Sequence, residues 1–366
     1  MRIGIITFHA ANNYGAVLQA YALQTYLQGI GHDPYFIDYQ YCWDIPIQKG
    51  LRGWFSRSAY GTAKKINSRL LRRVFSDFRE RYLCIDSHQY SGIQQLQTTP
   101  PVADVYMCGS DQIWNPDFIR EDDEESVWLS FGNGAVRRVA YAASFGRSEL
   151  YNHVCSRWSN YARDLDSISV RERTGICLMK KLGRSDVTWV PDPTLLLHNS
   201  DYVSLEPVFS PRDKFLFSYC LETDDYILQT TVKTTVQRVL GLACYEIKPY
   251  ALCNNVLNRC CIAPGQWLSR LRRSAFVVTN SFHGLVFSLL FRRPFIVLLR
   301  RIEGLEMSDR IISLLEVAGL KHRLLTICDE DQMGHLCSDT VDWDRVEDRI
   351  ADFREVGCRF IRDALS

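Results

Sequence analysis

The 366-residue sequence predicts an α/β protein of two domains, each an open parallel sheet covered by helices. Two observations support this fold class. Short apolar runs without polar alternation recur along the chain, which is typical of strands buried on both faces of a parallel sheet. Helical segments separate these runs, as right-handed crossovers between parallel strands require. The length also exceeds the roughly 100 to 200 residues expected of one domain.

The first domain is expected over residues 1–200. It opens with a β-α-β unit: the apolar strand IGIIT at 3–7, a helix over 16–28 that ends at Gly-Ile-Gly, and the strand YFID at 35–38. Further buried strands are expected within 104–111, 137–146, 167–175 and 187–193. The strands end in polar or glycine-rich stretches, so their carboxyl ends carry the candidate functional loops.

The pattern restarts after a proline-rich stretch, so a domain boundary is expected near 196–212 and a second domain over 201–340. Strands are expected within 214–221, 244–249, 276–279 and 294–299, and helices over 226–240, 265–273 and 284–291. Residues 341–366 predict an amphipathic helix, because its apolar residues recur three and four apart. We expect this helix to pack back on the first domain.

Composition excludes several classes of protein. Hydrophobic residues make up 46% and charged residues 23% of the chain, which fits a well-packed globular protein. The net charge of +1 gives no pull toward nucleic acid, so no nucleic-acid partner is expected. No signal peptide or apolar run of about 18 to 20 residues is present, which predicts a cytoplasmic protein.

The cysteines predict neither a metal site nor a redox motif. There are 13 of them but no CxxC pair, so we expect reduced thiols that are mostly buried. No metal or other cofactor is expected. The acidic cluster EDDEE at 121–125 is expected to be a solvated loop.

A basic helical insertion is expected over 49–83, where Lys and Arg far outnumber acidic residues. Apolar residues (Ile66, Leu70, Val74 and Phe78, or Leu71 and Phe75) line one face, and Lys64, Lys65, Arg69, Arg72 and Arg73 lie elsewhere. Two readings stay open: a helix packed on the first domain with a solvated basic face, or a helix that docks on an anionic membrane surface. The second would place the protein peripherally on the inner face of the plasma membrane.

His283 is the leading candidate for a catalytic residue. It follows the strand FVVT and stands at the start of a helix, where Asn280 or Ser281 can cap and free amides near Gly284 favour an anion. A histidine there can bind a phosphate or move a proton. The alternative is a histidine that packs in the core or caps the helix.

Two other strand ends are expected to open on the same interdomain cleft. Arg171 follows the strand SISV, and its planar guanidinium suits a carboxylate or phosphate; a surface ion pair with Glu172 is the alternative. Ser110 and Asp111 end another strand and suit sugar hydroxyls. Asp111 could equally cap a helix or order the loop of Trp114.

The loop before the first helix contains Asn12, Asn13, Tyr14 and Gly15. It has neither the GxGxxG spacing of a dinucleotide site nor the GxxxxGK[ST] of a P-loop. Amide and phenol groups suit a neutral, hydroxylated ligand better, so these four residues are expected on the acceptor side.

Six ordered blocks resemble the polysaccharide pyruvyl transferase family: TFHAANNYGAVLQAYALQ, CGSDQIWNP, YAASFG, SVRERTG, VPDPTLL and TNSFHGLVFSLLFRRPF. The resemblance spans residues 3 to about 300. It implies a GT-B-like fold, in which two Rossmann-like domains face across a cleft. It also implies that phosphoenolpyruvate, bound mainly by the second domain, donates its enolpyruvyl carbon to glycan hydroxyls without a metal.

The product implied is commonly a 4,6-linked pyruvate ketal on a hexose, here of a lipid-linked surface-polysaccharide precursor such as one for capsule or exopolysaccharide. The donor-site histidine of the family falls on His283 and its strand-end arginine on Arg171. Some members carry an arginine where this chain has Ser281. Arg292 or Arg293, after the helix, is expected to replace that charge.

Two other functions remain as alternatives. A glycosyltransferase of the same architecture would use a nucleotide sugar, with Glu303 or Glu306 holding the ribose. A non-catalytic saccharide-binding protein would not need His283 and Arg171 together.

Overall fold

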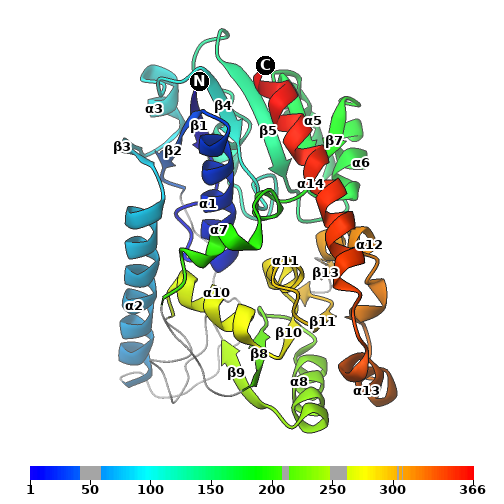
Figure 1. Ribbon diagram of the computed structural model, residues 1–366. Coiled ribbons are helices and arrows are strands. Elements are labelled where there is room, and N and C mark those ends of the chain that lie inside the picture. Colours follow the sequence, from blue (N-terminus) through cyan, green and yellow to red (C-terminus); the bar gives the residue numbers. More distant parts are fainter. Residues whose placement is uncertain (42–58, 208–213, 248–261, 303–304, 307) are drawn as a thin grey trace.

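The protein, described here by a computed structural model, contains two parallel sheets (Figure 1). The structure describes residues 1–366 except 42–58, 208–213, 248–261, 303–304 and 307; of 59–68, 302, 305 and 306 it describes the backbone only. The two sheets confirm the predicted fold class of two Rossmann-like domains.

The first sheet has seven parallel strands in the order β3-β2-β1-β4-β5-β6-β7. They are β1 (Arg2–Ile6), β2 (Asp33–Tyr39), β3 (Ile85–Tyr90), β4 (Val105–Cys108), β5 (Arg137–Ala143), β6 (Ser167–Val170) and β7 (Val187–Trp189). Between and after them lie α1 (Tyr14–Gly29), α2 (Ala59–Tyr82), α3 (Ile93–Thr98), η1 (Glu121–Asp123), α4 (Glu124–Val127), α5 (Asn152–Arg163), α6 (Arg173–Lys181), η2 (Pro193–Leu195) and α7 (Asn199–Val203).

The second sheet has five parallel strands in the order β14-β11-β10-β8-β9. They are β8 (Phe215–Tyr219), β9 (Ala243–Ile247), β10 (Phe276–Thr279), β11 (Phe295–Leu298) and β14 (Leu324–Leu325); β12 (Arg301–Ile302) and β13 (Leu305–Glu306) form a separate antiparallel pair. The helices are α8 (Tyr226–Leu240), α10 (Pro264–Arg273), α11 (Phe282–Leu290), α12 (Asp309–Ala318), η3 (Lys321–Arg323), α13 (Glu330–Ser338) and α14 (Trp343–Leu365).

Each sheet has one point where the chain reverses its direction of travel across the strands. In the first sheet β1 pairs with β2 on one side and β4 on the other, and in the second β8 pairs with β9 and β10. The loops that leave neighbouring strands at such a point diverge and leave room for a ligand. The candidate site is therefore expected where residues 7–13 and 109–111 approach residues 220–221 and 280–283.

A shared apolar core joins the domains. Tyr14 and Val17 of α1 belong to the same buried cluster as Trp267 of α10 and Leu285 of α11. The ring of Tyr14 stacks on Trp267 with centroids 5.4 Å apart, and its hydroxyl donates to the carbonyl of Ile262 at 3.0 Å. The domains thus meet through packed side chains.

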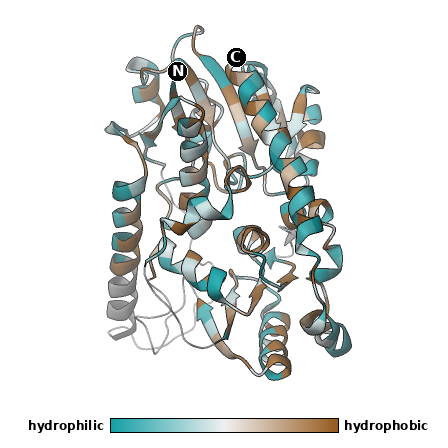
Figure 2. Ribbon diagram, in the orientation of Figure 1, coloured by the Kyte–Doolittle hydropathy of each residue, from teal (hydrophilic) through white to brown (hydrophobic). Residues whose placement is uncertain are grey.

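The last helix, α14, packs on both domains (Figures 1 and 2). Its first half contacts α12, and further along Phe353 packs on Trp189 with ring centroids 4.6 Å apart. At its end, Arg137 of β5 donates to the carbonyls of Ala364 and Ser366, both at 2.8 Å. Its buried residues recur at helical spacing, with polar residues on the outer face.

The expectation of a solvated acidic loop at 121–125 is wrong for two of its residues. Glu124 is buried and forms a bidentate ion pair with Arg157, and buried Asp123 accepts from the hydroxyl of Tyr39 at 2.5 Å. Both carboxylates are paired, which is the condition for burying a charge.

The expectation that most cysteines are buried is also wrong among the nine described. Three of these are buried, at 108, 220 and 358, and the others are intermediate or exposed. Cys260 and Cys261 lie outside the described residues.

Candidate active site

The site is built around a buried ion pair between Arg171 and Asp192. Both follow neighbouring strands, β6 and β7, at the same edge of the first sheet. A terminal nitrogen of Arg171 donates to Asp192 Oδ2 at 2.7 Å, and the Ser110 hydroxyl donates to the same oxygen at 3.0 Å. The Arg171 side chain is 1% and the Asp192 side chain 0% exposed, so the alternative of a surface ion pair for Arg171 is wrong.

Hydrogen bonds hold the Asp192 carboxylate in place. Its Oδ1 accepts from the backbone N–H of Thr194 at 3.0 Å and the Thr194 hydroxyl at 2.6 Å. Burial raises the pKa of Asp192, but His283, Arg171 and Thr194 together outweigh burial and hold it well below its ordinary value. Burial lowers the pKa of Arg171, but the charges of Asp192, Asp111 and Glu172 outweigh burial and raise it. Both groups are therefore charged.

His283 reaches this pair from the second domain. Ser281 is the N-cap of α11 and accepts from the backbone N–H of Gly284 at 3.4 Å, so His283 lies in the first turn of the helix instead of the preceding loop. Its Nε2 lies 3.6 Å from Asp192 Oδ2, and this buried nitrogen makes no hydrogen bond. His283 is thus neither the cap nor a fully satisfied core residue.

Two contacts from opposite domains fix the geometry. The Arg171 guanidinium lies over the ring of Phe282, 4.7 Å from its centroid. Gly15 of α1 lies against His283 so closely that a Cβ built on Gly15 would be 2.0 Å from His283 Nδ1. The glycine therefore makes room for the imidazole, a role different from the predicted acceptor contact.

Asp111 and Glu172 complete the acidic part of the site. Asp111 Oδ1 lies 3.9 Å from an Arg171 nitrogen, and its backbone adopts φ +79°, a conformation unfavourable for a residue with a side chain. Its carbonyl accepts from Ser144 N at 3.1 Å, which holds this conformation. One oxygen of buried Glu172 accepts from Ser144 and Phe145, while the other has no partner.

Several predicted residues have structural contacts instead of facing the ion pair. Ser110 is an exception, because it is buried and its hydroxyl contacts both Asp192 and Arg171. Asn280 instead bridges the backbone of Leu221 through both its amide atoms, at 2.6 and 2.9 Å. Tyr14 packs between the domains. Asn13 caps α1 by accepting from Gly15 N and Ala16 N, and Asn12 accepts from Arg79 at 3.2 Å.

Arg292 and Arg293 do not join the site. Both follow the C-terminal end of α11, whereas His283 lies in its first turn. Arg292 pairs with Asp344 on the surface at 2.9 Å, and Arg293 donates to the carbonyls of Phe291 and Ser274. The expectation that one of them replaces an arginine at position 281 is therefore wrong.

Asp192 was missed as a candidate from the sequence. The available signal was the motif VPDPTLL, in which an acidic residue comes three positions after the end of β7, the strand next to that of Arg171. Proline at the next position starts η2, and Asp192 is its N-cap. A capping role would have been the simpler interpretation of this residue; the structure shows that its second oxygen also binds Arg171.

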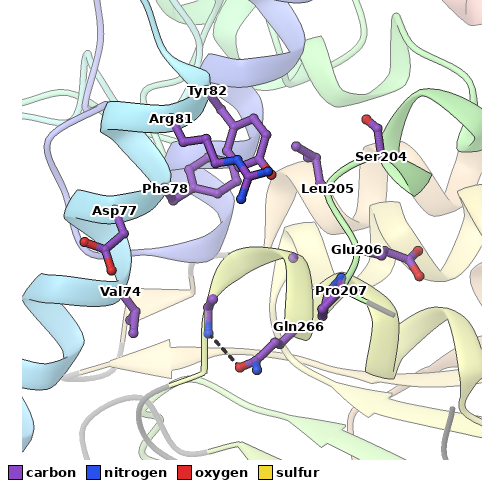
Figure 3. A pocket seen from close by; sticks show the side chains of 12 residues that line it. Val74, Asp77, Phe78, Arg81, Tyr82, Ser204, Leu205, Glu206, Pro207 and Gln266 are labelled. Atoms are coloured by element: carbon purple, nitrogen blue, oxygen red, sulfur yellow. Dashed lines mark hydrogen bonds between the residues drawn. The ribbon is translucent and has the colours of Figure 1, made fainter. Parts of the chain in front are cut away.

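Two further features of the described part of the chain bear on ligand binding. It contains no group of three or more His, Cys, Asp or Glu placed to hold a metal ion. A cavity of about 430 Å³ lies between α2, the segment after α7 and the start of α10, with Phe78, Arg81, Leu205 and Gln266 in its wall (Figure 3). None of its lining residues belongs to the Arg171 cluster, so it is a separate feature. Glu303 lies outside the described residues.

Comparisons with solved structures find proteins of similar length but low similarity. UGT89C1 of Arabidopsis thaliana complexed with UDP-L-rhamnose is 10% identical, with 97% of this chain and 93% of that chain covered and a TM-score of 0.47. UDP-GlcNAc 2-epimerase of Neisseria meningitidis bound to UDP-GlcNAc is 8% identical, with 97% and 93% covered and a TM-score of 0.45. MnaA of S. aureus with UDP is 10% identical, with 96% and 90% covered and a TM-score of 0.44.

Similarity at this level does not indicate a function. No curated protein matches the chain. The model of one family, polysaccharide pyruvyl transferase, matches residues 13–300, a span that contains Arg171, Asp192 and His283. The chain belongs to the polysaccharide pyruvyl transferase family.

Proposed function

We propose that this protein transfers the enolpyruvyl group of phosphoenolpyruvate to hydroxyls of a glycan and forms a pyruvate ketal. The supporting observation is that His283, at the start of a second-domain helix, lies beside the buried Arg171–Asp192 pair of the first domain. Phosphoenolpyruvate carries about three negative charges near pH 7, so it requires cations and amide donors together. Arg171 and the positive end of α11 meet that requirement.

The proposed reaction has two steps. One acceptor hydroxyl forms a C–O bond to the enol carbon, loses its proton to a base, and the methylene carbon gains a proton to become a methyl group. A second hydroxyl then forms a bond to the same carbon and loses its proton to a base, while the C–O bond to phosphate breaks and the phosphate leaves with the electron pair. We assign the phosphate contact and one of these proton transfers to His283, with Asp192 orienting the imidazole. The proposal uses no metal ion, because Arg171 and the α11 amides take the charge.

The acceptor is proposed to lie on the first-domain side. Asn12, Asn13 and Asp111 are each partly exposed and lie in the segments that follow β1 and β4, and Asp111 lies 3.9 Å from Arg171. Amide and carboxylate groups suit sugar hydroxyls. The acceptor we propose is a lipid-linked hexose, whose 4- and 6-hydroxyls become the ketal of the product.

We propose that α2 binds an anionic membrane surface through its charged side chains only. Phe75 and Phe78 are buried and Leu71 and Val74 pack on the shared core, so this apolar face is already covered. Arg69, Arg72 and Arg73 are exposed. These arginine side chains would then contact anionic lipid headgroups without insertion of the apolar face. The side chains of Lys64, Lys65 and Ile66 are not among those that the structure describes. No helix in the described part of the chain is long and apolar enough to cross a membrane.

The decisive experiment measures phosphate release from phosphoenolpyruvate with a panel of free and lipid-linked galactosides, glucosides and mannosides. We expect release with a subset of acceptors and a loss of about 100-fold or more in His283→Ala. His335→Ala, at an exposed histidine of α13, is the matched control and should keep full activity. Release of a nucleoside diphosphate from a nucleotide sugar, with no phosphate from phosphoenolpyruvate, would overturn the proposal.

A further inference from the structure

Arg310 is a second buried arginine beside the site. It is the second residue of α12, it is 8% exposed, and it comes from the second domain. With the amide oxygen of Gln112 facing Arg310, this oxygen accepts from both terminal guanidinium nitrogens, at 3.1 and 3.2 Å. Gln112 directly follows Asp111, whose carboxylate lies 3.9 Å from Arg171. Arg310 therefore approaches the Arg171 cluster from the opposite domain.

Arg310 differs from Arg171 in its ion pairing. Arg171 pairs with Asp192, but Arg310 forms no salt bridge with any residue that the structure describes, and its Nε is buried without a partner. Burial, and then the positive charge of Arg171, lower the pKa of Arg310 to about 10, although Glu172 and Asp111 act in the opposite direction. A buried cation close to another cation destabilises the folded protein unless an anion joins them.

The site lacks a cation at Ser281, because the N-cap of α11 is neutral. Arg292 and Arg293 lie at the far end of that helix. Unlike Arg171, Arg310 forms no salt bridge with a carboxylate that the structure describes, and it lies close enough to Arg171 for the charge of Arg171 to lower its pKa. Its planar fork suits a carboxylate or phosphate.

We propose that Arg310 is a donor-binding residue that, together with Arg171, binds the anionic groups of phosphoenolpyruvate between the two domains. This inference rests on the proposed function and adds a residue to it. The bound anion would neutralise a charge that the protein alone leaves unpaired. Arg310 would also link donor binding to the second domain through α12, which packs against α11 and α6.

The test measures phosphoenolpyruvate binding directly by titration calorimetry, so that the unknown acceptor is not required. Arg310→Met keeps the apolar stem but removes the charge, and we expect its Kd to rise about 10- to 100-fold, as for a lost charge-assisted hydrogen bond. Arg310→Lys should recover part of the affinity. Arg238→Gln, at an exposed arginine of α8, is the control and should bind like the wild type.

The thermal midpoint without ligand separates this role from a structural one. If Arg310 binds the donor, Arg310→Met removes an unpaired buried charge and should not lower the midpoint, whereas a structural arginine should lower it. Two results would overturn the role of Arg310 alone. One is that Arg310→Met binds phosphoenolpyruvate as tightly as the wild type. The other is that Arg310→Met lowers both the thermal midpoint and the affinity, and that Arg310→Lys restores neither. Absence of phosphoenolpyruvate binding by the wild type would instead overturn the proposed function and this inference with it.

Discussion

At the scale of single residues, Gly15 has an unusually specific role for a helical glycine. It lies in the first turn of α1 in the first domain, yet its missing side chain creates space for His283 of the second domain. Helix propensity alone would favour alanine there by about 1 kcal/mol. The requirement for glycine thus arises from the close approach of the two domains.

Gly15→Ala should therefore reduce activity although alanine favours the helix. A Cβ 2.0 Å from His283 Nδ1 must displace the imidazole from Asp192, and a displacement of about 1 Å can cost about 100-fold in rate. The measurement is kcat for phosphate release. Gly29→Ala, at the end of the same helix with nothing near the added Cβ, should retain wild-type activity. Wild-type kcat in Gly15→Ala would show that this contact does not position His283.

His9 makes stability depend on pH. It is buried, its Nδ1 lies 3.1 Å from the carbonyl of Thr7, to which it therefore donates, and its Nε2 has no partner. Burial lowers its pKa to about 4, with a smaller opposing effect of the Thr7 bond and a further decrease from Arg79. The unfolded chain therefore binds more protons than the folded protein between about pH 6.5 and 4.

Stability should consequently fall as the pH is lowered through that window, with about 3 kcal/mol due to His9. Urea midpoints measured from pH 7 to 4 check this. His9→Phe keeps a ring against Phe36 but cannot titrate, so its pH dependence should be weaker than that of the wild type. Identical slopes for the two proteins would exclude His9 as the source.

At the scale of elements, α2 shows why an amphipathic pattern does not by itself identify a membrane helix. Its apolar residues pack on α1 and α10, and the ring of Phe78 lies 6.5 Å from that of Tyr21. The same amphipathic pattern would equally suit a helix that lies on a bilayer surface. The exposed arginines are the part of α2 that remains for an anionic surface.

The variant Arg69→Gln, Arg72→Gln, Arg73→Gln should lose vesicle binding at low salt. Each arginine near an anionic surface contributes about 1 kcal/mol, so three amount to about 100-fold in partitioning. Co-sedimentation with phosphatidylserine-containing vesicles measures this. The matched control changes the exposed Arg345, Arg359 and Arg362 of α14 to Gln, which alters net charge equally. Equal loss in both variants would point to net charge instead of α2.

At the scale of the whole molecule, the two domains share one apolar core, and the active site contains residues from both. Tyr14, Trp267 and Phe282 are buried between them, and Phe282 packs on Arg171. Large apolar interfaces couple domains, whereas polar ones leave them independent. The protein is therefore expected to unfold as one unit.

Calorimetry should show a single unfolding transition for the wild type. Tyr14→Ala should lower stability by about 3 to 5 kcal/mol, because it removes the stacked ring from Trp267 and leaves a cavity between the domains. The exposed Tyr226→Ala of α8 should have little effect. Two separate transitions in the wild type would contradict the coupling.

Most strands and helices of the two sheets could be predicted from the sequence, because a strand buried on both faces needs an apolar run and a crossover helix needs apolar residues three and four apart. Arg171 and His283 could be found because residues that follow parallel strands lie at one edge of a sheet. β3 was not predicted: IDSHQY lies at the sheet edge, is largely exposed and has no apolar run.

Which side chains meet between the domains could not be predicted from the sequence. Asp192 and Arg310 contact side chains that lie far from them in the chain. Tyr14 packs on Trp267 between the domains. Arg292 and Arg293 lie at the end of α11 opposite to His283. Local patterns report the face and ends of an element. They contain no information on the orientation of two domains, and that orientation sets which charges are paired and which remain for a substrate.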